Sequence, residues 1–143
     1  METNYGFIIE KTGKKIKLEL QRKFNESNFD ITVDQWVVLL ELYSHGTQNQ
    51  VELCERCFKD APTMTRIVEL LVKKEFVERS PCITDRRKYD ISLNKKGKQL
   101  IQKLLPTVIA FRKEGWKDLT EKDIQHLIRI TNKISINLDN YVR

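Results

Sequence analysis

Three consecutive cationic residues, Arg86, Arg87 and Lys88, follow the acidic residue Asp85 between two strand-like stretches of the chain. Adjacent positive charges at the tip of an exposed turn repel one another unless a polyanion lies nearby. A guanidinium is favoured in a narrow minor groove, where the negative potential of a DNA duplex is concentrated. Asp85 is not expected to touch DNA. It is predicted to hold a neighbouring arginine in one rotamer, so that less side-chain entropy is lost on binding. The alternative is a solvated turn.

The segment 60–74 is predicted to be a helix that presents polar side chains to a partner. Asp60 is a good N-cap, and Pro62 is tolerated in the first turn, where its missing N–H has no helical partner. The apolar residues recur at helical spacing and define an inward stripe of Met64, Ile67, Val68 and Leu71. The outer surface or its margin then carries Thr63, Thr65 and Arg66. An alternative for Arg66 is a surface salt bridge with Glu69, which would be worth little energy.

The predicted elements around these two segments have the order of a winged helix-turn-helix. A helix that starts at the capping box Thr32–Gln35 is followed by a short helix capped by Asn49, the helix 60–74, and strands over 76–82 and 88–93. In such a fold one helix enters the major groove, whose base edges are distinguishable, and the hairpin can reach an adjacent minor groove. Phosphate contacts are expected from Asn49, Gln50, Lys95 or Lys96.

Longer helices are predicted on both sides of this region. Over residues 5–25, one helical stripe carries Tyr5, Ile9, Ile16, Leu20 and Phe24, while Leu18 lies on the opposite side. Asn94 is predicted to cap a long helix that Pro106 should bend. Thr120 begins a final helix with more apolar residues than a terminal element needs for its own domain. We interpret this last helix as a dimerisation helix, with a helix folded over its own domain as the alternative.

Length and charge fit one domain that binds a polyanion. The chain has 143 residues and a formal net charge of +6, and residues 59–98 hold 11 basic against 6 acidic side chains. Charge alone also fits a soluble basic surface. We predict a single domain over 1–143, mainly α with a small β-hairpin wing. Residues 30–97 would form the winged helix-turn-helix DNA-binding lobe, and residues 1–25 and 98–143 the dimerisation helices.

The cysteines and the absence of long apolar runs indicate a cytoplasmic protein. A DNA-binding regulator of the kind predicted above is not expected to be an enzyme. No apolar run approaches membrane-spanning length, and the charged N-terminus lacks a signal-peptide layout. Three cysteines without a secretory signal indicate a reducing compartment. Cys54 and Cys57 form a C-x-x-C pair, which we interpret as core residues of a helix, because zinc would need further ligands. Cys82 is expected to be exposed and open to oxidation. No metal or cofactor is expected.

The segment 49–97 resembles the MarR family (multiple antibiotic resistance regulators). The matching stretches are ELCERC at 52–57, TMTRIVELLVKKEFVERSP at 63–81, DRR at 85–87 and ISLNKKG at 91–97, and TVDQW at 32–36 resembles the second helix of the family. Three positions depart from the family pattern. Cys57 replaces a leucine, Glu75 replaces a common glycine, and Asn94 replaces a threonine N-cap.

The resemblance implies a homodimer that presents two recognition helices to a pseudo-palindromic operator in double-stranded DNA. It implies regulation of transcription, often relieved by a small aromatic or phenolic effector. By position, Arg87 matches the wing arginine that enters the minor groove, and Asp85 matches its orienting acid. The residues expected at DNA are Asn49, Gln50, Pro62, Thr63, Thr65, Arg66, Arg86, Arg87 and Lys88. A ligand cavity could be bordered by Tyr5, Trp36, Phe111 and Trp116, although core packing is the default for Trp36.

The sequence therefore favours a homodimeric DNA-binding transcription regulator, more specifically a repressor. Two alternatives from other classes stay open. One is a thiol-based redox or metal sensor that uses Cys54, Cys57 and Cys82. The other is a winged helix that serves as a protein-interaction module.

Overall fold

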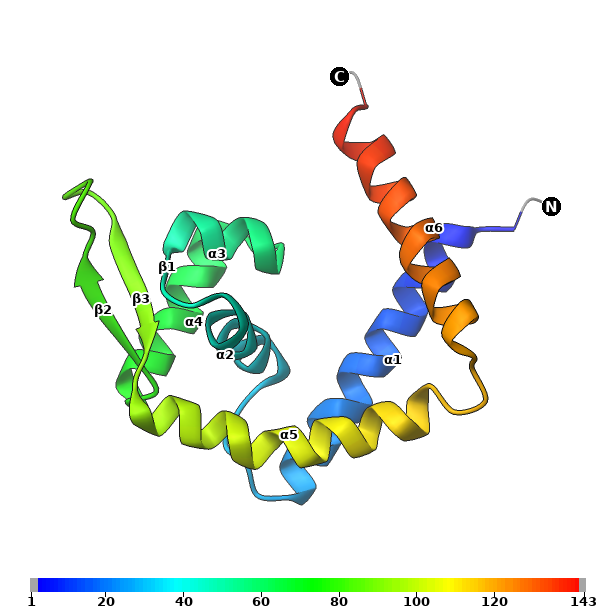
Figure 1. The fold of residues 1–143 in the computed structure, drawn as a ribbon, viewed down its shortest axis with the longest axis horizontal. Helices are drawn as coiled ribbons and strands as arrows, with labels where there is room; N and C mark the ends of the chain where they lie inside the picture. Colours follow the sequence, from blue (N-terminus) through cyan, green and yellow to red (C-terminus); the bar gives the residue numbers. More distant parts are fainter. Residues whose placement is uncertain (1–2, 142–143) are drawn as a thin grey trace. The chain divides into compact units, whose positions relative to one another are not determined.

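The computed structural model describes residues 3–141, which form helices and one small sheet (Figure 1). The chain divides into two units, one up to Phe111 and one from Arg112 onward. The elements of the first unit are α1 (Tyr5–Glu26), α2 (Val33–His45), β1 (Gln48–Asn49), α3 (Gln50–Cys57), α4 (Ala61–Lys73), β2 (Val77–Pro81), β3 (Tyr89–Leu93) and most of α5 (Lys95–Gly115). The second unit contains the last turn of α5 and the whole of α6 (Glu121–Asp139). The predicted fold class, mainly helical with a β-hairpin wing, is confirmed.

Side-chain caps fix where the helices begin, as the sequence predicted. The Thr32 hydroxyl accepts the Gln35 N–H at 3.1 Å, while the Gln35 side chain accepts the Thr32 N–H at 3.1 Å. Thr120 and Asp123 form the same reciprocal pair at the start of α6. Such a capping box satisfies two backbone donors that the first helical turn leaves without intrahelical partners. The N-caps predicted at Asn49, Asp60 and Asn94 are also present.

The sheet contains one strand that the sequence analysis missed. The order is β1-β3-β2, all antiparallel, with β1 pairing Gln48 with Ile91 and Asn49 with Asp90. Two residues are too few for a period-two pattern to be recognised. This short strand matters because it leads directly into α3, so the β1–β3 pairing fixes the start of α3 against the hairpin. The hairpin itself was predicted correctly apart from its ends.

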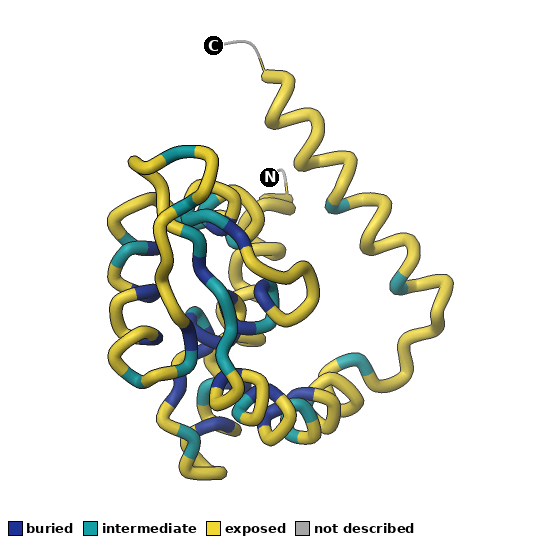
Figure 2. Tube along the Cα trace, turned by 60° about the vertical axis from the view of Figure 1, so that its left-hand side comes forward, coloured by how far each residue is buried: buried dark blue, intermediate teal, exposed yellow. Residues whose placement is uncertain are grey.

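The core of the first unit lies between α2, α4, α5 and the inner face of the sheet, where Figure 2 shows the buried positions in dark blue. All four residues of the predicted inward stripe of α4 are buried, namely Met64, Ile67, Val68 and Leu71. Trp36 is only 2% exposed, and its ring packs edge-on against Phe24 with 6.2 Å between the centroids. This contact joins α2 to the end of α1.

The predicted apolar stripe of α1 is buried only at its C-terminal end. Leu20 and Phe24 lie in the core, whereas Tyr5 and Ile9 are exposed. The α6 helix has no buried residue, and most of its large apolar side chains are exposed, including Leu127, Ile128, Ile134 and Leu138 (Figure 2). Within residues 3–141, no helix is long and apolar enough to cross a membrane. The assignment of residues 1–25 and 98–143 to dimerisation stays a prediction.

An ion-pair network joins α1, α2 and the loop before α4. The Asp34 carboxylate accepts from Lys17 Nζ at 2.9 Å and from Lys59 Nζ at 2.7 Å. Partial burial acts to raise the pKa of Asp34, but the hydrogen bonds from Lys59 and Lys17 outweigh it and hold the pKa below its ordinary value. A lowered pKa in the folded state means that the charged carboxylate stabilises the fold above its ordinary pKa, and that this contribution disappears as the pH falls through the folded-state pKa.

We therefore expect Asp34→Asn to lower the free energy of unfolding near neutral pH, by at most about 1 kcal/mol because solvent screens the pair. The difference from wild type should stay constant from about pH 7 to about pH 5 and shrink as the pH falls through about 4 toward about 2, since the wild-type carboxylate becomes neutral only below its ordinary pKa. Urea unfolding of both proteins across this range measures it. A difference that stays constant with pH would contradict an ionic role for Asp34.

Candidate nucleic-acid interface

The first turns of α4 form one half of the candidate interface. Asp60 Oδ1 accepts the Thr63 N–H at 2.7 Å, and this backbone hydrogen bond lowers the pKa of the carboxyl. Pro62 and Arg66 are exposed, while Thr63 and Thr65 are half-buried at the margin of the surface. Arg66 forms no ion pair with any residue in 3–141, so the alternative salt bridge with Glu69 is not formed. Its guanidinium is therefore available to an external anion.

The start of α3 lies directly beside this surface. Gln50 Nε2 donates to Thr65 Oγ1 at 2.7 Å, which connects the first residue of α3 to α4. The Asn49 side chain is engaged with Glu52, accepting its N–H at 2.9 Å and donating to its carboxylate at 2.9 Å. Both residues were predicted to contact phosphate. The structure gives each an intramolecular hydrogen bond, and their contact with DNA stays a prediction.

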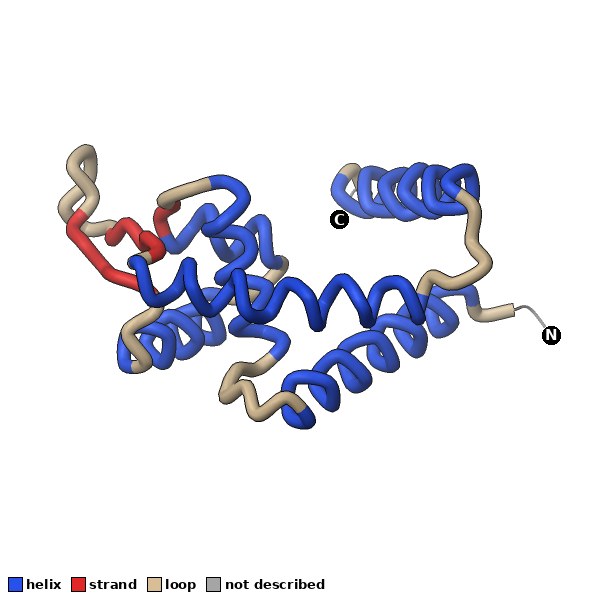
Figure 3. Tube along the Cα trace, turned by 60° about the horizontal axis from the view of Figure 1, so that its bottom comes forward, coloured by secondary structure: helices blue, strands red, loops and turns tan. Residues whose placement is uncertain are grey.

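The turn between β2 and β3 forms the other half, and it extends beyond the strands (Figure 3). Asp85 Oδ1 accepts the Arg87 N–H at 3.0 Å and Arg87 Nε at 3.2 Å, and Asp85 Oδ2 accepts Arg87 Nη2 at 3.4 Å. The hydrogen bond from the Arg87 backbone, followed by those from its side chain, lowers the pKa of Asp85. The Arg87 side chain is nevertheless 90% exposed. The expected contact between Asp85 and a neighbouring arginine is therefore present, and Arg87 is the partner.

Arg86 and Lys88 complete the basic turn. Both are exposed, and neither forms an ion pair within the described part of the chain. The turn is closed by backbone hydrogen bonds from Cys82 N to Lys88 O at 2.9 Å and from Lys88 N to Asp85 O at 3.0 Å. These bonds hold the loop in a defined shape, so the cations are presented by an ordered hairpin.

The two halves are connected through β1 and α3. Asn49 lies opposite Asp90 in the β1–β3 pair, two residues from Lys88 at the basic turn. The next residue, Gln50, contacts Thr65 on α4. A strand pair and one hydrogen bond therefore link the polar surface of α4 to the tip side of the hairpin, which is the juxtaposition that contact with one duplex requires.

Of the two lysines predicted to contact phosphate, Lys96 has intramolecular partners. Lys96 Nζ donates to Lys74 O at 3.1 Å, lies 3.3 Å from the Glu75 carboxylate, and sits 5.4 Å from the centroid of the Phe76 ring. Lys95 is exposed and forms no ion pair within residues 3–141. Lys96 therefore holds α5 against the segment that follows α4.

The four residues predicted to border a ligand cavity are not brought together within the first unit. Tyr5 is 72% exposed at the start of α1, whereas Trp36 is buried against Phe24, which lies about 28 Å further along that helix. Phe111 is half-buried at the end of the first unit, and Trp116 is half-buried in the second. Their role in ligand binding stays a prediction.

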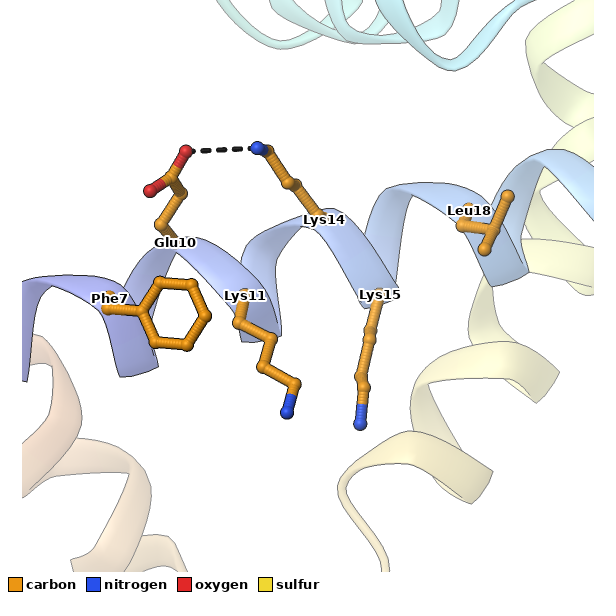
Figure 4. A pocket seen from close by; sticks show the side chains of 6 residues that line it. All are labelled: Phe7, Glu10, Lys11, Lys14, Lys15 and Leu18. Atoms are coloured by element: carbon orange, nitrogen blue, oxygen red, sulfur yellow. Dashed lines mark ion pairs between the residues drawn. The ribbon is translucent and has the colours of Figure 1, made fainter.

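A surface hollow of about 230 Å³ runs along α1, separate from these residues. It is lined by Phe7, Glu10, Lys11, Lys14, Lys15 and Leu18, with Lys14 paired to Glu10 at 3.0 Å (Figure 4). Figure 4 shows Lys11 and Lys15 extending to the same side of the helix. All six residues that line the hollow are exposed residues of α1, so the hollow is open to solvent.

The three cysteines are free thiols in different surroundings. Cys54 and Cys57 are half-buried against the core, and burial raises the pKa of both thiols, which favours the uncharged form. Cys82 was expected to be exposed but is half-buried, with its Sγ 3.3 Å from the Thr84 hydroxyl, and this hydrogen bond lowers the pKa of its thiol. Residues 3–141 contain no group of three or more His, Cys, Asp or Glu side chains that could hold a metal ion.

Comparisons with known proteins agree with this geometry. The model of the MarR family matches residues 31–89. The HTH-type transcriptional regulator SarZ from Staphylococcus aureus (strain MRSA252) is 30% identical over 125 residues, which cover 85% of this chain and 83% of SarZ. A mutant of E. coli MarR, solved in complex with operator DNA, is 27% identical with a TM-score of 0.81 and covers 90% of this chain and 91% of its own.

The fold is also shared with more distant relatives. A MarR protein from Peptoclostridium difficile has a TM-score of 0.84 at 18% identity, with 98% of this chain and 90% of that chain covered. The element order, the hairpin and the sequence relationships agree. The chain belongs to the MarR family of transcription regulators.

Proposed function

We propose that this protein is a sequence-specific repressor that binds double-stranded DNA with α4 in the major groove and the β2–β3 wing in the minor groove. The observation that carries the proposal is the Arg87 side chain, which Asp85 holds through two hydrogen bonds while it stays 90% exposed. A third hydrogen bond joins Asp85 to the Arg87 backbone N–H. An arginine fixed at the tip of a hairpin without burial suits insertion into a narrow minor groove. The family relationship to an HTH-type regulator and to an operator-bound structure supports this function.

The proposal includes a homodimer on a pseudo-palindromic operator. Exposed apolar side chains along α1 and, separately, along α6 support it, since a large apolar area is more often covered in an assembly than left in water. A two-fold symmetric dimer would present two α4 helices to two half-sites about one helical turn apart. Cytoplasmic location and release from DNA by a small aromatic or phenolic effector belong to the same proposal and rest on the family resemblance.

DNA from upstream of the protein's own gene is expected to bind in a salt-dependent way. Several cations at the wing and α4 would displace counterions, so the logarithm of affinity should fall steeply and linearly with the logarithm of salt concentration. Fluorescence anisotropy at several salt concentrations measures this, with a shuffled duplex of the same length as the control. Light scattering should give twice the mass of one chain. If the protein does not bind this DNA in low salt without ligand, the alternative hypothesis, in which the winged helix is a protein-interaction module, would be favoured instead.

A further inference from the structure

We infer that Gln50 is a positioning residue for DNA recognition, which orients the Thr65 hydroxyl so that it donates to a hydrogen-bond acceptor on DNA. This inference rests on the proposed function and deepens it. The observation behind it is the hydrogen bond of 2.7 Å from Gln50 Nε2 to Thr65 Oγ1, which joins side chains 15 residues apart on two helices. Neither side chain forms another hydrogen bond within residues 3–141.

The backbone at Gln50 is restrained, so its side chain extends from a fixed position. Gln50 is the first residue of α3, and the residue before it is both the N-cap of that helix and the end of β1. The backbone at Gln50 is therefore held by the β1–β3 pairing on one side and by the Asn49 cap on the other. A side chain that starts from such a restrained backbone loses little further freedom when its amide engages Thr65.

The direction of this hydrogen bond assigns a chemical role to Thr65. A hydroxyl has one proton to donate and two lone pairs. Because the Gln50 amide donates to the Thr65 oxygen, the Thr65 proton remains available for an acceptor outside the protein. In the major groove the acceptors are N7 and O6 of guanine, N7 of adenine and O4 of thymine, and phosphate oxygens are acceptors as well. Cytosine offers only a donor there and should be disfavoured opposite Thr65.

A double-mutant cycle tests this inference. Gln50→Ala should weaken DNA binding by about threefold to tenfold per half-site, the value of one hydrogen bond. In a Thr65→Val background the same change should cost less than about twofold, since the hydroxyl that Gln50 orients is absent. Thr63→Val is the matched control, because Thr63 lies on the same helix and does not contact Gln50. Its effect should be additive with Gln50→Ala. If the losses of affinity caused by Gln50→Ala and Thr65→Val were also additive, the inference would be overturned.

A panel of operators with single base changes separates the two sources of the acceptor. If Thr65 meets a base edge, Thr65→Val removes discrimination at one operator position; if it meets a phosphate, all operators weaken equally. Both results support the inference. Gln50→Glu reverses the hydrogen bond, because a carboxylate only accepts, so affinity should fall and any remaining preference should move toward a donor base. Wild-type affinity and preference in Gln50→Glu would refute the assigned direction. Wild-type protein that binds no duplex would instead refute the proposed function.

Discussion

Replacing Arg87 with alanine should weaken binding to the operator by roughly 30-fold to 1,000-fold. The reason is that a dimer would lose one minor-groove arginine from each of its two wings, and each contact is worth about 1–2 kcal/mol. The slope of log affinity against log salt should also fall by about 2, one for each lost cation. Anisotropy titrations over a range of salt concentrations measure both quantities. Because the side chain is 90% exposed, the free energy of unfolding should not change.

Two neighbouring variants separate orientation from charge. Arg86→Ala removes the same charge from the same turn, but within residues 3–141 the Arg86 side chain forms no hydrogen bond or ion pair with Asp85. It should reduce the salt slope similarly and cost much less affinity. Asp85→Ala removes an acid close to DNA, so an effect of net charge alone would strengthen binding. We expect binding about twofold to tenfold weaker, because Arg87 must then be ordered at the moment of binding. Equal losses for Arg86→Ala and Arg87→Ala, or tighter binding by Asp85→Ala, would contradict the wing assignment.

Features set by neighbours along the chain could be predicted from the sequence. The capping residues Thr32 and Asp60 act over three residues, and the inward stripe of α4 follows from the helical period. The pairing of Asp85 with an arginine two residues away is also local. The sequence also singled out Glu75 as the replacement of a common glycine. The structure gives a local reason for that glycine, since Glu75 adopts φ = 64°, in the left-handed region in which glycine is favoured.

Features that depend on contacts between distant segments could not be predicted. The strand β1 has two residues and exists only because β3 pairs with it. The Asp34 network joins Lys17 and Lys59, which lie 17 and 25 residues away, and the contact between Gln50 and Thr65 crosses two helices. For a related reason the sequence could not show how much of the α1 stripe is buried in the first unit, because periodicity shows which residues share a face but not how far a neighbouring element reaches along it.

The junction between α4, the wing and α5 depends on one glycine. Gly97 is buried in the first turn of α5, where its N–H is donated to Asn94 Oδ1 at 2.8 Å. Asn94 in turn donates through its backbone to Phe76 O at 3.3 Å and through its side chain to Glu75 O at 2.6 Å. A Cβ atom at Gly97 would overlap the Phe76 carbonyl oxygen and lie 3.0 Å from Leu93 Cδ2. The principal obstacle is backbone, which cannot change rotamer as a side chain would.

Gly97→Ala is therefore expected to lower the free energy of unfolding by about 3 kcal/mol or more, at the upper end of what overpacking costs. Gly13→Ala is the matched control, because an added Cβ there has no neighbour within 4 Å and the residue lies inside α1. It should stabilise the fold by up to about 1 kcal/mol through helix propensity. Urea unfolding of both variants measures the contrast.

The α5 start is bonded to the backbone around Phe76, directly before β2, so Gly97→Ala should also displace the wing and weaken DNA binding in conditions where the variant is still folded. A Gly97→Ala protein as stable as Gly13→Ala would show that α5 can move away from this turn, and the wing would then lack the rigid base on which the role of Arg87 depends.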